Sequence, residues 1–346
     1  MRARALIFLT AAAQGFLLGW PVSSWAQHYE ITDLGLLPGR RLTEAFAINA
    51  RYQVVGLADA PAVAFRWDSG EMVDLGTLGG TSAVAFGINN RGEVVGGSTL
   101  PGNAAIRGFV WRDGLYRDVG TLGGANSIAY AINQRGLVLG LAETSAGGVR
   151  TFLWQERGGM VDLGPLSLGG DPEDTRPQAL NNAGAIVGEA ETHNGEQHAF
   201  LWQRGVMTDL GTLGGSWSVA RDINDAGVVV GFATAADTLD YSAVRWTHGQ
   251  VESLGTLGRW SQARAVNNRG DVVGAARALD GTTHAILWRD GVLISLNDLI
   301  PPESGWWLAY ANDINDPGAI VGVGRIKGQV RAFLLTPIHT SAQPAP

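Results

Sequence analysis

One unit recurs seven times along this chain, and that periodicity limits the possible folds more than any other feature. The copies begin at Asp33, Asp74, Asp118, Asp162, Asp209, Ser253 and Asp298. Their spacing therefore stays between 41 and 47 residues. The clearest copy, residues 74–117, reads DLGTLGG, then TSAVAFGINNRGEVVGGS, a variable stretch and GFVWRDGLYR. A period of this length with several short strands indicates a closed ring or a stacked array of structural units.

Each copy divides into four segments with the composition of β-strands. The first segment ends on a pair such as Ile88-Asn89, and the second carries Val-Val-Gly, as at 94–96. A turn such as NNRG joins them, with Asn first and Gly fourth, which suits a type I turn closed by a left-handed residue. The first copy has Tyr52 in place of that Gly, which predicts a strained or altered turn. The third segment ends on a tryptophan in six copies, where core packing is expected, and the fourth leads into Asp-Leu-Gly.

Units of four antiparallel strands at this spacing have the size of β-propeller blades. The sequence therefore predicts an all-β fold, a seven-bladed β-propeller over residues 27–338. An extra fourth-type segment at 29–34 opens the chain, and the last copy stops after its third segment, at 331–335. We expect the N-terminal strand to complete the C-terminal blade, because this pairing covers edges that would otherwise promote aggregation. The alternative is an open β-solenoid, which needs terminal caps that the sequence does not show.

These motifs resemble the bacterial extracellular repeats called HAF repeats, after the His-Ala-Phe triplet that stands here at 198–200. The elements DLGTLGG, INxxGxVVG and AFxW carry the resemblance, which covers residues 29–337. The last copy is similar to the terminal unit of that family. The resemblance implies an exported repeat protein without an established activity, and it transfers no catalytic residues.

The first 26 residues have the pattern of a secretory signal peptide. Arg2 and Arg4 precede an apolar run, and Ser24-Trp25-Ala26 supplies small residues two apart before a cleavage site. Cleavage predicts a secreted or periplasmic protein without a membrane span. The alternative is an uncleaved N-terminal anchor. At the other end, residues 339–346 are rich in Ala, Pro, Ser and Thr and are expected to be disordered.

Composition removes several classes of function. The chain has no cysteine, which excludes disulfides, thiol nucleophiles and thiolate metal sites. Its formal charge is −7, whereas nucleic-acid binding needs a basic surface. We expect a monomer that does not bind nucleic acid.

Most sequence variation between the copies falls in the loops between the second and third segments. We expect these loops on the same face as the loops that join one copy to the next. Loops on a rigid scaffold are common binding sites. The entry loops carry four tryptophans in consecutive copies and two arginines in the first copy: Trp217, Trp260, Trp306, Trp307, Arg40 and Arg41. An arc of these side chains would stack sugar rings or planar ligands, or anchor a protein partner. The alternative is that the tryptophans wedge neighbouring blades apart.

No catalytic motif stands out. HExxH, GxSxG, GxxxxGK and the sialidase-type Asp box are all absent from the sequence. We expect no catalysis, no cofactor and no metal. The repeated Asp of Asp-Leu-Gly should accept turn amides, since the dense Asp pattern of calcium loops is missing. A longer loop with Asp171, Glu173 and Asp174 is either a cation site or a solvated loop.

Three functions remain open at this point. The first is a binding or scaffolding module for a glycan or an envelope protein. The second is a carbohydrate-active hydrolase or lyase that uses loop carboxylates, for which glycoside hydrolysis would need two opposed groups. The third is a purely structural repeat protein of the cell envelope.

Overall fold

The computed structural model describes residues 29–338, with residues 60, 237 and 239 left out. The predicted signal peptide (1–26) and tail (339–346) lie outside the described residues. Within the described ranges the regular structure is β-strand, apart from short 3-10 helices: η1 (Pro101–Asn103), η2 (Pro172–Asp174), η3 (Leu296–Asp298) and η4 (Pro302–Ser304). In that part of the chain, no helix has the length and apolar character needed to span a bilayer.

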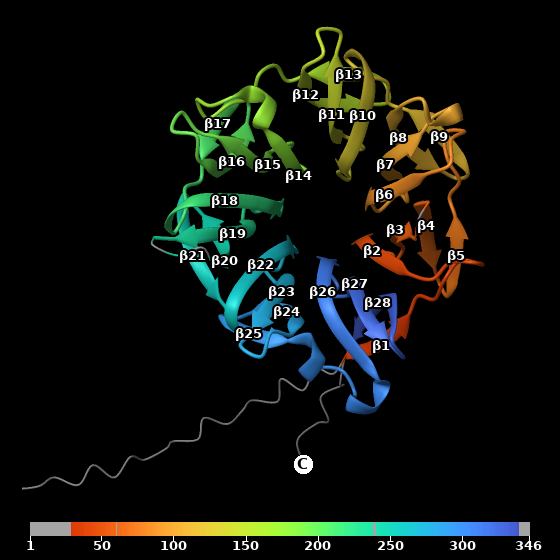
Figure 1. Cartoon of the computed structure of the whole chain (residues 1–346), viewed down its shortest axis with the longest axis vertical. Coiled ribbons are helices and arrows are strands. Elements are labelled where there is room, and N and C mark those ends of the chain that lie inside the picture. Colours follow the sequence, from red (N-terminus) through yellow and green to blue (C-terminus); the bar gives the residue numbers. More distant parts are fainter. Residues whose placement is uncertain (1–28, 60, 237, 239, 339–346) are drawn as a thin grey trace, which may run out of the picture.

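The strands form four-stranded antiparallel units that follow the repeats. The first units contain β2 (Thr43–Ile48), β3 (Val54–Ala58), β4 (Val63–Asp68) and β5 (Glu71–Asp74); β6 (Ala83–Ile88), β7 (Val94–Thr99), β8 (Ile106–Arg112) and β9 (Leu115–Asp118); and β10 (Gly123–Ile132), β11 (Val138–Thr144), β12 (Val149–Gln155) and β13 (Gly159–Asp162). In Figure 1 the units stand around a common centre, each with its first strand innermost.

The remaining units repeat this order. They contain β14 (Arg176–Leu180), β15 (Ile186–Glu191), β16 (Gln197–Gln203) and β17 (Val206–Asp209); β18 (Gly214–Ile223), β19 (Val229–Ala235), β20 (Tyr241–Thr247) and β21 (Gln250–Gly255); β22 (Gly258–Val266), β23 (Val272–Ala278), β24 (Thr283–Arg289) and β25 (Val292–Ser295); and β26 (Trp306–Ile314), β27 (Ile320–Ile326) and β28 (Gln329–Pro337) with β1 (Tyr29–Asp33). A single parallel pairing of Gln197 with Trp217 joins β16 to β18 and merges two units into one eight-stranded sheet.

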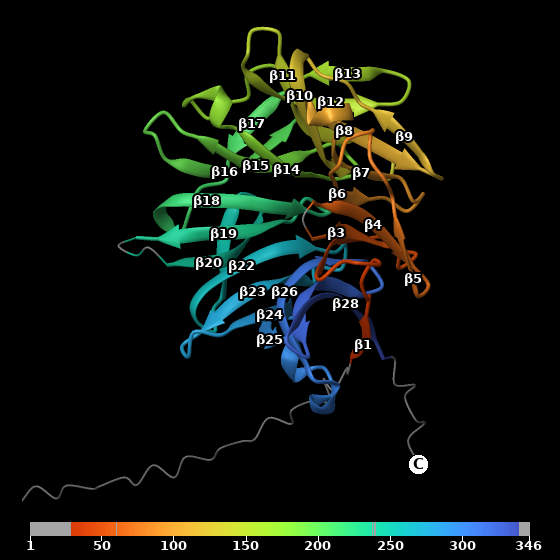
Figure 2. The same ribbon diagram turned by 45° about the vertical axis from the view of Figure 1, so that its right-hand side comes forward.

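The two ends of the described chain meet in one sheet. β1 pairs antiparallel with β28, with Tyr29 opposite Pro337 and Asp33 opposite Phe333. Figures 1 and 2 both show the red β1 beside the blue β28. The predicted pairing of the N-terminal strand with the last repeat is confirmed. An open solenoid would hold these strands apart.

Apolar packing fills the space between neighbouring sheets. Trp154 is only 7% exposed and packs with Phe152 of its own repeat and Val95 of the preceding one. A tryptophan this well buried hides enough apolar surface to stabilise the fold by several kcal/mol. The predicted core position is thus confirmed for Trp67, Trp111, Trp154 and Trp246, whereas Trp202 and Trp288 are half-buried.

The turn of the first repeat carries the predicted strain. Tyr52 has a φ of 63°, in the left-handed region that disfavours side chains, where the second repeat has Gly92 at 81°. Both backbone amides donate to the backbone carbonyl of the Asn that starts the turn: Tyr52 to Asn49 and Gly92 to Asn89. The turn therefore keeps its shape, and the first repeat bears the conformational cost.

Candidate functional site

The loops divide between two faces of the molecule. The loops that enter each repeat contact the variable loops between second and third strands: Thr81 donates to Asn103 Oδ1 (3.0 Å) and Asp171 to Glu191 Oε2 (2.8 Å). This side is called the entry face, and the predicted sharing of one face is confirmed. The opposite side carries the Asn-initiated turns and the hairpins between third and fourth strands, and is called the ring face.

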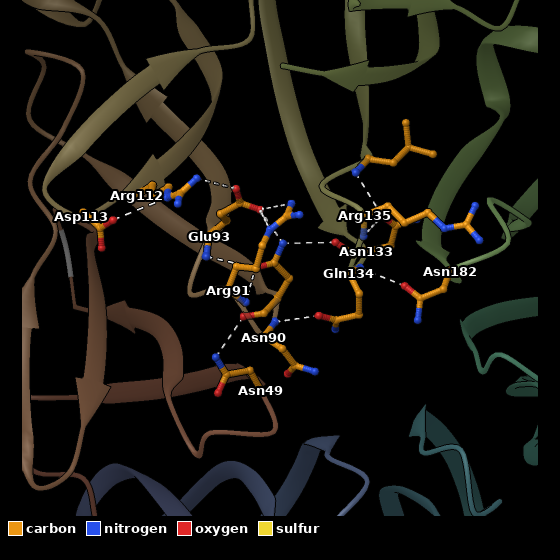
Figure 3. Close-up of polar contacts among 12 residues, drawn as sticks. Asn49, Asn90, Arg91, Glu93, Arg112, Asp113, Asn133, Gln134, Arg135 and Asn182 are labelled. Carbon is orange, nitrogen blue, oxygen red and sulfur yellow. Dashed lines mark hydrogen bonds and ion pairs between the residues drawn. The ribbon is translucent and has the colours of Figure 1, made fainter. Parts of the chain in front are cut away.

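A closed circle of hydrogen bonds runs through the ring face. In each repeat, the Asn that starts the turn donates its Nδ2 to the backbone carbonyl of the equivalent Asn in the next repeat. The circle contains Asn49, Asn89, Asn133, Asn181, Asn224, Asn267 and Asn315, with distances of 3.0–3.2 Å. Its last bond runs from Asn315 back to Asn49. We call this set the asparagine ring, part of which appears in Figure 3.

The same side chains also hold their own turns. Asn181 Oδ1, for example, accepts the backbone amides of Ala183 and Ala185, each at 3.0 Å. The Asn was predicted as a turn former, which is confirmed. Its bond to the next repeat was missed, although the same residue at every copy was a signal for it.

A second circle of hydrogen bonds runs beside the asparagine ring. The residue after each ring Asn accepts, through its side chain, the backbone amide of the equivalent residue in the preceding repeat. Figure 3 shows two of these bonds, Asn90 to Gln134 (2.8 Å) and Gln134 to Asn182 (2.9 Å). The circle is open at one joint because Ala50 has no side-chain acceptor for the amide of Asp316. That joint lies between the last and first repeats.

A small cavity of about 180 Å³ lies on the axis inside these circles. Apolar ring-face residues such as Ile88 and Ile132 line it, together with the half-buried Asp222. Asp222 and its equivalent Asp313 stand where the other repeats have Ala or Gly, a departure that the sequence shows but that was not singled out. Each carboxylate accepts a backbone amide of a following repeat, Val266 for Asp222 and Ile48 for Asp313.

Burial dominates the acid–base behaviour of this pair. It raises the pKa of Asp222 to about 6, against the opposing effect of the donated amides. Burial raises the pKa of Asp313 to about 7, and the charge of Asp222 adds to the rise. Both groups therefore change protonation near neutral pH.

Two of the predicted binding residues belong to one aromatic cluster on the entry face. Tyr241 stacks on Trp260 (5.6 Å between centroids, 27°) and meets Trp217 edge-on at 6.0 Å. Phe232 packs against both Trp217 and Tyr241 at 4.8 Å. Trp217 remains 38% exposed, whereas Trp260 is half-buried. We call Trp217, Phe232, Tyr241 and Trp260 the aromatic cluster.

The aromatic cluster has cationic neighbours. The guanidinium of Arg221 lies 5.6 Å from the Phe232 ring centroid. The guanidinium of Arg264 lies 4.6 Å from the ring centroid of Tyr310, which is not part of the cluster. Burial lowers the pKa of both arginines, although each stays charged at neutral pH. Sequence reasoning missed these two arginines, as well as Phe232 and Tyr241, because their positions match ordinary strand positions of the repeat.

The other predicted binding residues take separate places. Trp307 is 39% exposed, meets His284 edge-on at 4.7 Å and donates from Nε1 to the Thr283 carbonyl (3.0 Å). Trp306 packs against Phe333 at 6.2 Å. Trp307 thus contacts the preceding repeat, as Trp260 contacts Tyr241, and this is the wedging role that was the alternative to binding.

The two predicted arginines lie against their own repeat. Arg40 donates to the Pro61 carbonyl (3.1 Å), and Arg41 pairs with Asp59 (3.4 Å) while its side chain is 89% exposed. No contact joins either arginine to the aromatic cluster among the described residues.

The repeated and clustered carboxylates have local roles. The Asp of Asp-Leu-Gly accepts the amide two residues on, as Asp74 does from Gly76 at 2.7 Å, which confirms the predicted turn role. In the acidic loop, Asp171 accepts the Glu173 amide at the start of η2, and Asp174 pairs with Arg176. Over the described residues, no three His, Cys, Asp or Glu side chains gather as metal ligands would.

Comparison with known proteins supports the fold and not a family. No family model matches the chain, and no curated protein matches it in sequence. The HAF-repeat resemblance therefore stays a prediction. Among solved structures, the chain is similar to a catalytically inactive virginiamycin B lyase from Staphylococcus aureus with quinupristin (TM-score 0.57, 13% identity, 90% of this chain and 100% of that one).

A second solved structure is a β-propeller domain. It belongs to the trilobed protease from Pyrococcus furiosus (TM-score 0.56, 10% identity, 88% of this chain and 100% of that one). That domain is described as having an open velcro topology, whereas β1 pairs with β28 here. At these identities the likeness shows the fold alone: the chain is an all-β protein with a β-propeller fold.

Proposed function

We propose that the chain is a seven-bladed β-propeller that is exported and binds a carbohydrate on its entry face through the aromatic cluster. The observation that carries this proposal is Trp217, a large aromatic side chain left 38% exposed beside three other rings. An exposed indole that stands beside further rings offers a flat apolar surface on which a ligand can stack.

The chemistry of the cluster suits a sugar. The apolar face of a pyranose ring stacks on an exposed indole, and its hydroxyl groups need donors and acceptors nearby. Arg221 and Gln178, which are joined by a 3.2 Å hydrogen bond, supply such groups. The neighbouring Tyr241 is fixed by Trp260, so the platform is rigid before the ligand arrives and little entropy is lost on binding.

A glycan array probed with the purified protein tests this function. Trp217→Ala and Trp260→Ala should each lose binding, while Trp307→Ala is the matched control because Trp307 is equally exposed but lies outside the aromatic cluster. Binding that survives both cluster substitutions would reject the site. Bound glycan recovered unchanged would agree with a binding module, and cleaved glycan would favour the hydrolase or lyase alternative.

We further propose that residues 1–26 direct export and are then removed. The basic start, apolar run and small-residue site carry this proposal. Cell fractionation followed by N-terminal sequencing checks it. A mature chain that begins at Gln27 in the periplasm or medium agrees, and an intact N-terminus in the membrane fraction supports the anchor alternative.

A further inference from the structure

The ring face carries a groove that neither the repeat pattern nor the proposed function uses. It has a volume of about 1020 Å³ and lies between the β6–β9 and β10–β13 units. Its apolar lining includes Val110, Leu115, Ile132 and Trp154. This volume is at the upper end of the range of ligand pockets in proteins.

A small side chain opens this groove. In two other repeats the residue equivalent to Val110 is an arginine that covers the tryptophan of the next repeat: Arg66 lies over Trp111 at 5.1 Å, and Arg245 lies over Trp288 at 4.6 Å. The other equivalents are leucines, so Val110 is the smallest side chain at this position. Val110 therefore leaves room in the groove, while Arg117 of the next strand lies over the Trp154 ring at 5.7 Å.

One wall of the groove is longer than its equivalents. The hairpin after Trp154 contains one additional residue, since Trp154 pairs with Met160, whereas Trp111 pairs with Tyr116. This insertion adds Arg157 to the groove. The small Val110 and the longer hairpin, the two departures from the repeat, therefore both line this groove.

The groove is positively charged on an acidic protein. Its lining includes five arginines and three carboxylates, an excess of two positive charges, although the whole chain carries −7: Arg91, Arg112, Arg117, Arg135 and Arg157, with Glu93, Asp113 and Glu156. Such a local excess attracts anionic groups.

Three of the guanidinium groups are held in place. Figure 3 shows Glu93, whose side chain is 10% exposed, between Arg91 (2.6 Å) and Arg112 (3.6 Å). On the other side, Arg117 lies 5.7 Å from the Trp154 ring centroid and pairs with Glu156 at 2.6 Å. Fixed guanidinium forks bind carboxylates with little further ordering.

Two guanidinium groups are available to a ligand. Arg135 and Arg157 are exposed, and the described residues include no ion-pair partner for either side chain. In Figure 3 the Arg135 guanidinium points away from the Glu93 cluster. Both arginines belong to the residues that line the groove.

We propose that this groove binds an acidic peptide segment of a partner protein. Arg135 and Arg157 pair with its carboxylates, and Leu115, which is 77% exposed, covers an aliphatic side chain between them. A sugar fits less well because Trp154 is 7% exposed and offers almost no aromatic surface for stacking. The molecule would then hold a glycan on one face and a protein on the other.

Fluorescence anisotropy with a labelled Glu-Leu-Glu-Leu-Glu-Leu peptide tests this site. The peptide should bind the full mature chain, with an affinity that falls as salt rises. Arg135→Ala with Arg157→Ala should weaken binding about tenfold or more, as loss of charged hydrogen bonds does. The matched control is Arg204→Ala with Arg325→Ala, which removes the same charge from exposed positions elsewhere and should change affinity less than about twofold.

Val110→Arg separates shape from charge. This substitution places in the second repeat the residue type found at Arg66 and Arg245, so it adds a positive charge while it narrows the groove. Loss of binding despite the added charge supports the groove. Stronger binding would show that the peptide merely senses surface charge and would overturn the proposal.

Further outcomes decide against the peptide. If the peptide does not bind, or binds the Arg135/Arg157 double variant as well as the parent, the groove is not its site. If tri-galacturonate binds in the groove and the peptide does not, the ligand is an acidic saccharide instead. Unchanged circular dichroism and melting temperature of each variant establish that the fold is intact.

Discussion

The ring face and the entry face are built from the same repeats in opposite ways. On the ring face an Asn recurs in every repeat and its Nδ2 bonds to the next repeat, so the circle closes only if each copy supplies the same group. On the entry face the loops differ in length and sequence, and Trp217 is left more than a third exposed. Residues that recur in every repeat thus close the array. Positions where one repeat differs from the others mark candidate ligand sites on either face, and the Val110 groove is one of them.

Buried and entry-face tryptophans give the largest contrast. Trp154→Ala should lower the free energy of unfolding by about 3–5 kcal/mol, because it empties a core aromatic site. Trp217→Ala should cost less, about 1–2 kcal/mol, since that ring is 38% exposed although it packs against Phe232 and Tyr241. Urea denaturation of both variants measures the difference. Equal losses would erase the distinction between a structural and a ligand-facing tryptophan.

Next in size is the contrast between the two hydrogen-bond circles. Asn181→Ala removes one bond to the next repeat and two within its turn, all buried, and should cost about 2–4 kcal/mol. Asn182→Ala changes the second circle, whose residues are more exposed, and should cost about 1 kcal/mol. Thermal unfolding compares them. A larger loss for Asn182→Ala would contradict the central role of the asparagine ring.

Asp222 and Asp313, the carboxylates on the axis, predict a pH dependence of the free energy of unfolding that is intermediate in size. Because the pKa of Asp313 is raised to about 7 from 3.8, the folded state keeps a proton that the unfolded state has lost. Stability should therefore fall as pH rises from about 4 to 7, by about 1–3 kcal/mol, because the partial exposure of Asp313 moderates the effect. Asp313→Asn should flatten this slope, and the exposed control Asp290→Asn should not. An unchanged slope in Asp313→Asn would show that the carboxyl titrates normally.

The open joint of the second circle, between Asp316 and Ala50, predicts the smallest effect. Ala50→Asn would give the Asp316 amide the acceptor that the other repeats provide and should stabilise the fold by about 0.5–1 kcal/mol. Ala226→Asn, also in an exposed ring-face turn, is the control without such a partner. A destabilised Ala50→Asn variant would mean that this joint differs in geometry from the rest.

The sequence was enough for the strands and their closure because these follow from local, repeated chemistry. The four segments per copy, the strained Tyr52 turn and the pairing of residues 29–33 with the last repeat were all predicted from spacing and turn residues. The wedging contact of Trp307 with the preceding repeat was open as an alternative.

Contacts between repeats were harder to predict. The aromatic cluster joins Trp260 to Tyr241 across two units, and the Val110 groove forms between two units. Arg40 and Arg41 occupy slots equivalent to Trp306 and Trp307, but side-chain length let them reach Pro61 and Asp59 instead. Equivalent sequence positions share a backbone place, and the neighbours decide where each side chain lies.

Amide hydrogen exchange of the N-terminal strand tests the closed array most directly. If β1 completes the sheet with β28, the amides of β1 that bond to β28 should be protected as long as those of β28 itself, since both open only when the ring opens. Exchange of the β1 amides at the rate of a free peptide, while β28 stays protected, would contradict closure through this strand.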